Sequence, residues 1–209
     1  MSSLAICGID FDNTIVSYDE LLTAVARERG LIDNGFVETK RSIRDRIRQL
    51  PGGEIEWQKC QAVLYGPRIG EARLVDGVAP FLRLCRERGM AVHIVSHKTE
   101  FSRYDATGTN LRTAAMNWMV ARGFFDGDGL GLSPESVHFS ATRAGKIECI
   151  RSLACTHFID DLEETFLEPD FPATTARILF EPGRQTPAPG GVALMRTWQE
   201  IREHFFSAN

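Results

Sequence analysis

The chain has 209 residues, of which 43% are apolar, and it carries a net charge of -4. This length is enough to bury one core and a small accessory unit, but not two full domains. The acidic balance supplies no general basic field, so it argues against nucleic acid as a primary partner and against an anionic membrane surface.

The cysteines and the N-terminal segment indicate where the protein works. None of the five cysteines has the close Cys/His spacing of a zinc site, so we expect reduced, packed thiols. The first apolar run has no basic residues before it and is followed at once by Asp10 and Asp12, unlike a secretion signal. No apolar stretch is long enough to span a bilayer. We therefore expect a soluble, cytoplasmic protein.

Short apolar runs alternate with helical patterns along most of the chain. The first run, residues 4–9, ends at two acids, which is typical of a strand that is buried on both faces. Comparable runs follow at residues 91–95, 136–139, 156–159 and 176–180. Helical patterns cover residues 80–88, 111–122, 144–153 and 195–205. This alternation predicts an α/β fold with a parallel sheet and helices on both of its faces.

One region interrupts the alternation, because the pattern there is helical throughout. It breaks at three places: near Gly30, at residues 51–53 and at residues 66–67. We assign residues 17–75 to a small helical cap that is inserted after the first strand, and residues 1–16 and 76–209 to the core.

The predicted cap carries a basic stripe. Lys40, Arg44 and Arg48 repeat at helical spacing, on other faces than the apolar Ile43 and Ile47. Such a stripe fits either a solvated helix face or a contact with an anionic substrate, and the sequence leaves both open.

Polar side chains follow several of the predicted strands. Open parallel sheets bind ligands beyond the carboxyl ends of their strands, so these residues are expected to share one pocket. They are Asp10 and Asp12, Ser96 and His97, and Asp160 and Asp161, with Lys146 at the start of a helix. Clustered carboxylates repel one another unless a cation is bound, and Mg2+ prefers such oxygen ligands together with a phosphate. The serine and the lysine would complement the phosphate.

These segments resemble the four motifs of the haloacid dehalogenase-like hydrolase superfamily. The motifs appear here in order as Gly8-Ile-Asp10-Phe-Asp12-Asn-Thr14, His93-Ile-Val-Ser96, Lys146, and Phe158-Ile-Asp160-Asp161. The resemblance implies a Rossmann-like core, and it places the insertion where that superfamily carries its first type of cap. It does not extend to the sequence of the cap.

The resemblance also implies a role for each matching residue. Asp10 would be the nucleophile that forms an aspartyl-phosphate, and Asp12 would be the general acid and base. Metal binding falls to Asp10, Asp12, Asp160 and Asp161, and phosphate binding to Thr14, Ser96, His97 and Lys146. Lys98 and Arg143 are rivals for the role of the lysine. Members that split carbon–halogen bonds typically lack an acid at the position of Asp12.

The sequence therefore predicts a Mg2+-dependent phosphatase that hydrolyses a small phosphorylated metabolite, a soluble phosphomonoester. Two alternatives stay open. One is a phosphoryl transferase or phosphomutase of the same superfamily, and the other is a non-catalytic binding module that keeps the fold. The oligomeric state is left open.

Overall fold

A computed structural model describes residues 5–33, 35 and 40–207 of the chain. Contacts between residues divide it into two compact units. The first contains the described residues within Met1–Val16, Leu74–Lys98 and Arg122–Asn209. The second contains those within Ser17–Arg73 and Thr99–Ala121.

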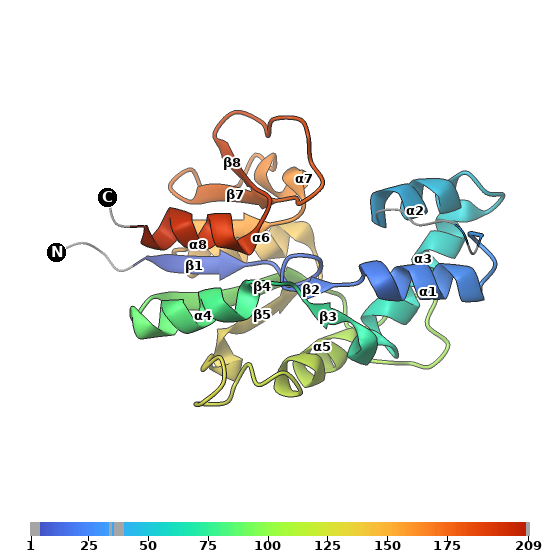
Figure 1. The fold of residues 1–209 in the computed structure, drawn as a ribbon, viewed down its shortest axis with the longest axis horizontal. Helices are drawn as coiled ribbons and strands as arrows, with labels where there is room; N and C mark the ends of the chain where they lie inside the picture. Colours follow the sequence, from blue (N-terminus) through green and yellow to red (C-terminus); the bar gives the residue numbers. More distant parts are fainter. Residues whose placement is uncertain (1–4, 34, 36–39, 208–209) are drawn as a thin grey trace. The chain divides into compact units, whose positions relative to one another are not determined.

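A six-stranded parallel sheet forms the centre of the first unit (Figure 1). Its strands are β1 (Ile6–Ile9), β4 (Ala91–His97), β5 (Val137–Ser140), β6 (His157–Asp160), β7 (Ala176–Phe180) and β8 (Val192–Met195). Their order across the sheet is β5-β4-β1-β6-β7-β8, and every neighbouring pair runs parallel. The predicted α/β fold with a parallel sheet is confirmed.

Helices cover both faces of this sheet. They are α4 (Val78–Glu87), α6 (Arg143–Ser152), α7 (Glu163–Phe166) and α8 (Trp198–Phe206). Leu179 of β7 packs in one apolar cluster with Ile147 of α6, while the ring of the next residue, Phe180, lies 5.8 Å from the ring of Trp198 in α8. Successive side chains of a strand point to opposite faces, so α6 and α8 cover opposite faces. The ring of Phe81 in α4 lies 5.2 Å from Trp198, which places α4 beside α8.

The C-terminal part of the sheet differs from the sequence prediction. The helix predicted at residues 195–205 begins at Trp198, and Met195 instead ends the unpredicted strand β8. This strand is a run of only four apolar residues, Val-Ala-Leu-Met, and an apolar run this short cannot be told from part of a helix by periodicity alone. Residue 4, which was predicted to begin the first strand, lies outside the described residues.

The second unit is mainly helical. It contains α1 (Asp19–Glu28), α2 (Lys40–Arg48), α3 (Gly53–Tyr65), the 3-10 helix η1 (Ile69–Glu71) and α5 (Leu111–Val120). Two short strands, β2 (Val16–Ser17) and β3 (Arg73–Leu74), pair with each other. The predicted breaks coincide with helix ends: Gly30 follows α1, Gly52 is the N-cap of α3 and Gly66 is its C-cap.

Residues 99–121, which the sequence analysis assigned to the core, pack with this helical unit. The indole Nε1 of Trp118 in α5 donates a 3.1 Å hydrogen bond to the carbonyl of Ala72. Leu111 also lies close to Gly66, because a Cβ added at Gly66 would lie 3.2 Å from the Cδ2 atom of Leu111. The second unit is therefore assembled from two segments of the chain.

The described residues include no helix that is both long and apolar enough to cross a membrane. All five cysteines are free thiols, as predicted, and burial raises the pKa of the Cys7 thiol.

Candidate active site

The candidate site lies at the carboxyl ends of β1, β4 and β6. β1 occupies the middle of these three strands, because the chain adds β4 and β5 on one side of it before it crosses to β6 on the other. Open α/β sheets bind ligands in the crevice that forms outside the strand ends at such a switch of direction. The backbone N–H of Asp10 donates to the carbonyl of Ile159 at 2.8 Å, so the ends of β1 and β6 are fixed side by side.

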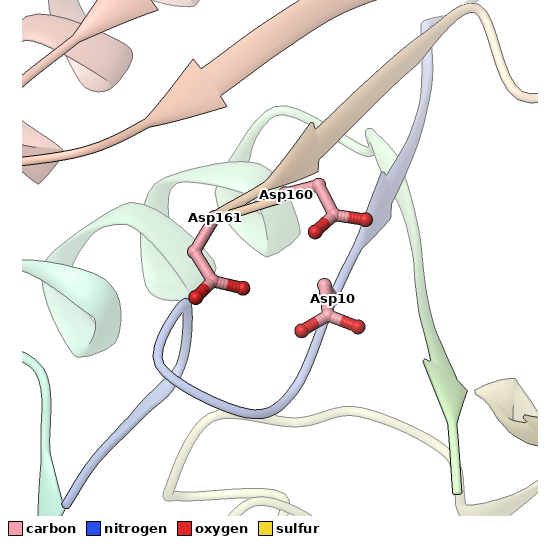
Figure 2. Close-up of side chains that lie close together, drawn as sticks. All are labelled: Asp10, Asp160 and Asp161. Carbon is pink, nitrogen blue, oxygen red and sulfur yellow. The ribbon is translucent and has the colours of Figure 1, made fainter. Parts of the chain in front are cut away.

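Three carboxylates converge at this point. Asp10 follows β1, Asp160 ends β6 and Asp161 comes next, and one oxygen from each lies within 4.8 Å of the others. Figure 2 shows the three side chains directed at a shared space from the two strand ends. Asp10 and Asp160 are buried, whereas Asp161 is partly exposed.

Lys146 neutralises part of this charge. It lies in the first turns of α6, and its Nζ donates to Asp10 Oδ1 at 2.5 Å and to Asp160 Oδ2 at 2.7 Å. Burial alone would lower the pKa of its ammonium, but the contacts with Asp10 and Asp160 outweigh burial and raise it. Lys146 is therefore a fixed positive charge beside the predicted nucleophile.

The surroundings of Asp10 disfavour its ionised form. Burial raises the pKa of this carboxyl to about 7, although Lys146 opposes the rise, and the nearby Asp160 and Asp12 add to it. The single positive charge of Lys146 thus does not balance the negative charges of the neighbouring carboxylates. An additional cation would stabilise the ionised form of Asp10, which is the form that a nucleophile needs.

The donor set fits Mg2+. Asp10, Asp160 and Asp161 offer hard carboxylate oxygens, and the partial exposure of Asp161 leaves room for the waters that this ion retains. The group contains no thiolate or imidazole that would favour a softer metal. Asp12, which the sequence analysis also assigned to the metal, lies outside this group.

Asp12 has its own lysine. The Nζ of Lys98 lies 2.8 Å from Asp12 Oδ2 and 3.1 Å from Oδ1. Lys98 is buried, while the Asp12 side chain keeps 17% of its surface exposed. The two lysines that competed for one role in the sequence analysis are therefore both in the site, on different carboxylates.

Two hydroxyl groups at the site have no hydrogen-bond partner among the described residues. They are Thr14 Oγ1 and Ser96 Oγ, and both side chains are buried. Unpaired buried hydroxyls are costly, so such groups are often the ones that a ligand satisfies. The chemistry of these two atoms fits the phosphate-binding role predicted for them.

The other predicted binding residues lie further from this arrangement. His97 is exposed, unlike Ser96 and Lys98 on either side of it, and its Nε2 lies 3.2 Å from the carbonyl of Ala141. Arg143, the other rival for the lysine role, pairs with Glu168 at 3.0 Å. Neither makes a described contact with the carboxylates of the site.

Comparisons with solved structures identify the fold. A HAD-family hydrolase from Deinococcus radiodurans, solved with bound phosphate and sodium, superposes with a TM-score of 0.57 at 16% identity, covering 98% of this chain and 96% of its own. A haloacid dehalogenase-like hydrolase from Streptococcus pneumoniae matches with a TM-score of 0.57, 16% identity and coverage of 99% and 100%. The fold is that of the haloacid dehalogenase-like hydrolases. The resemblance read from the sequence is thereby confirmed at the level of the fold.

This fold hosts more than one chemistry. An L-2-haloacid dehalogenase matches the haloacid dehalogenase-like fold of this chain with a TM-score of 0.50, 14% identity and coverage of 97% and 99%. No protein-family profile matches the sequence, and no curated protein matches it. The side chains of the site, rather than the fold, must therefore distinguish among the possible reactions.

The pairing of Lys98 with Asp12 was missed by sequence reasoning. The signal was the spacing, because Lys98 follows Ser96 by two positions and side chains two apart along a strand share a face. The sequence did not indicate that Asp12 is the partner of Lys98, because 86 positions separate the two residues.

Proposed function

We propose that this protein is a Mg2+-dependent phosphatase that works through a phosphorylated Asp10. The observation that carries the proposal is the pair of differently held carboxylates in the first motif. Asp10 is buried against Lys146, whereas Asp12 is partly exposed and held by Lys98. One group is suited to attack in a dry site, and the other to exchange protons with a leaving group and with water.

The first half of the reaction forms the covalent intermediate. A carboxylate oxygen of Asp10 attacks phosphorus, and the bond from phosphorus to the leaving oxygen breaks while Asp12 donates a proton to that oxygen. Lys146, Ser96 and Thr14 supply a positive charge and hydroxyl donors for the phosphoryl oxygens, whose charge is redistributed in the transition state.

The second half releases phosphate. Asp12, now a carboxylate, accepts a proton from a water molecule as the water attacks phosphorus, and the bond to Asp10 breaks. Both residues return to their starting states, so the cycle consumes one water and yields an alcohol and phosphate.

Asp10, Asp160 and Asp161 would hold the Mg2+ ion. When bound, the ion supplies a Lewis acid that offsets the negative charge of the phosphoryl group and of the carboxylates. The bound phosphate in the Deinococcus radiodurans relative supports a phosphate site on this fold. We further propose a small phosphorylated metabolite of the cytoplasm as the substrate.

The test is release of phosphate from 4-nitrophenyl phosphate and from a panel of phosphorylated metabolites. We expect turnover that is lost on chelation, regained with Mg2+ and abolished in Asp10→Asn. Interconversion of phosphate isomers without release would instead identify a phosphomutase. Halide release from L-2-chloropropionate, with no phosphate release from any substrate, would overturn the proposal.

A further inference from the structure

We propose that Lys98 is a positioning residue that holds the Asp12 carboxylate in the orientation from which it transfers protons. This inference rests on the proposed function. One ammonium contacts both oxygens of Asp12, at 2.8 Å and 3.1 Å. A charge-assisted pair that engages both oxygens restricts rotation of the carboxylate about its last torsion, which is otherwise soft.

Lys98 is itself fixed in place. Lys98 directly follows β4. Its backbone N–H donates to the carbonyl of Ser140 at 2.8 Å, which ties the residue to the end of β5. Its Nζ lies 5.6 Å from the centre of the Phe11 ring. Phe11 is fully buried and directly precedes Asp12, so the lysine contacts two consecutive residues of the same loop.

The backbone at Asp12 leaves the side chain in need of such support. Asp12 lies in the tight turn after β1, where Asn13 has a φ of 63° and its N–H donates to the carbonyl of Val16 at 2.8 Å. This turn fixes the backbone, but the Asp12 side chain stays 17% exposed. Lys98 therefore adds a restraint on the side chain to those that fix the backbone.

The two lysines divide the carboxylates of the site between them. Lys146 contacts Asp10 and Asp160, whereas Lys98 contacts Asp12. Without Lys98, the Asp12 carboxylate would lose the ammonium that contacts both of its oxygens. Misplacing a catalytic group by about 1 Å can cost about 10²-fold in rate.

The experiment compares Lys98→Met with wild type on two substrates, phenyl phosphate and 4-nitrophenyl phosphate. Phenolate needs a proton on leaving far more than 4-nitrophenolate does. We expect kcat for phenyl phosphate to fall about 10- to 10²-fold with KM nearly unchanged, and the first bond cleavage in 4-nitrophenyl phosphate to be affected least. Lys59→Met, which removes a partly exposed lysine paired with Glu56, is the matched control and should match wild type.

The decisive measurement repeats Lys98→Met in an Asp12→Asn background. If Lys98 acts through Asp12, its loss there should change the residual rate less than about twofold, a non-additivity that general loss of structure does not produce. Thermal unfolding checks that each variant is folded. Lys98→Gln, which keeps a donor, should lie between wild type and Lys98→Met, and it replaces the methionine variant if that one fails to fold.

The outcomes separate the two proposals. An equal fall in kcat in both backgrounds, or a wild-type rate in both Lys98 variants, overturns the role of Lys98 while phosphatase activity stands. Full turnover in Asp10→Asn, or no phosphate release by wild type, overturns the proposed function and the inference with it.

Discussion

Asp10 and Asp12 are two positions apart, yet their surroundings suit different tasks. Asp10 is buried, contacts Lys146, and has a pKa raised to about 7 by burial, with Lys146 opposing the rise. Asp12 is paired with Lys98 and keeps part of its surface open. A nucleophile is more reactive where water is excluded, whereas an acid and base must reach both the leaving oxygen and water.

The proposed roles predict a distinctive defect in Asp12→Asn. This change keeps the nucleophile but removes proton transfer, which is typically worth about 10²–10⁴-fold. With 4-nitrophenyl phosphate, formation of the intermediate should be partly rescued, because 4-nitrophenolate leaves without a proton. Hydrolysis should stay slow. Stopped-flow absorbance should show a burst of about one equivalent of 4-nitrophenol, followed by a slow steady rate.

The same samples supply the control. Acid-labile phosphate should accumulate on Asp12→Asn during the burst and be absent from Asp10→Asn. Asp12 would be a structural residue only if its asparagine variant showed neither a burst nor a substrate-dependent rescue.

The Ser96 hydroxyl allows binding and stability to be separated. Ser96 Oγ is buried and has no partner among the described residues, so Ser96→Ala should leave the free energy of unfolding unchanged or slightly higher. If the hydroxyl binds the phosphoryl group, kcat/KM should fall by about 10²-fold. Urea unfolding and steady-state kinetics measure the two quantities.

Thr175→Val is the matched control with the opposite expectation. The Thr175 hydroxyl is also buried, but it donates to the carbonyl of Cys155 at 2.7 Å. Its loss should cost about 1–3 kcal/mol of unfolding free energy and leave the activity of folded protein unchanged. A Ser96→Ala protein that is destabilised but fully active would show that this hydroxyl is structural.

At the scale of elements, β1 packs closely against its neighbours, and Asp10, the proposed nucleophile, directly follows it. Gly8 lies between β4 and β6, and an added Cβ there would come within 2.5 Å of the Phe158 ring and 3.0 Å of Cys155 Sγ. The Lys146 Nζ in turn lies 5.3 Å from the centre of the Phe158 ring. The absent side chain at Gly8 therefore lets Phe158 fill the space beneath the lysine.

We predict that Gly8→Ala destabilises the protein and lowers its activity. Overpacking of a rigid core typically costs about 1–3 kcal/mol, and a displaced Phe158 would also disturb Lys146. Urea unfolding and kcat measure the two effects. Gly183→Ala is the control, because no atom lies within 4 Å of a Cβ at that position. Equal stability of the two variants would contradict the packing argument.

Strand and helix prediction succeeded where the sequence pattern was strong. The apolar runs that became β4 to β7 have strand length and several are separated by helical patterns, so periodicity and length were sufficient to identify them. β8 was missed, and Met195 was assigned to the following helix because an apolar residue fits either pattern. An N-cap marked the true start of α8: the Thr197 hydroxyl accepts from the N–H of Glu200, and the Glu200 carboxylate accepts from the N–H of Arg196, just before the cap.

The sequence was sufficient to group the residues that strand ends place, but not those whose position depends on side-chain direction, and the roles of all of them stay predictions. The ends of β1 and β6 bring Asp10, Asp160 and Asp161 together, as parallel strands require. The strand period of two would have placed Lys98, rather than His97, on the same face as Ser96, but the motif itself does not include this position.

At the scale of the whole molecule, the residues of the candidate site all belong to one of the two units. Every carboxylate, hydroxyl and lysine of the site lies in the first unit, even though the second is inserted at two places. The basic stripe of the cap has local partners, because Arg44 pairs with Asp45 and Arg48 with Glu54. These exposed pairs are typical of a solvated helix face and contribute little to stability.

Removing the second unit should therefore succeed only if both of its segments are removed. A variant that lacks residues 17–73 alone leaves α5 without α3 and η1, so Leu111 and Trp118 lose the packing at Gly66 and Ala72. We expect this variant to aggregate or to be cleaved by protease within residues 99–121.

A variant that also lacks residues 99–121, with each gap bridged by a short Gly/Ser linker, should be soluble and resist cleavage. Because it keeps Asp10, Asp12, Ser96 and Lys146, it should still hydrolyse 4-nitrophenyl phosphate. Limited proteolysis, circular dichroism and phosphate release compare the two variants with the full chain. If the variant that lacks only residues 17–73 resisted protease as well as the full chain does, α5 would not depend on the inserted helices and the division into these two units would be wrong.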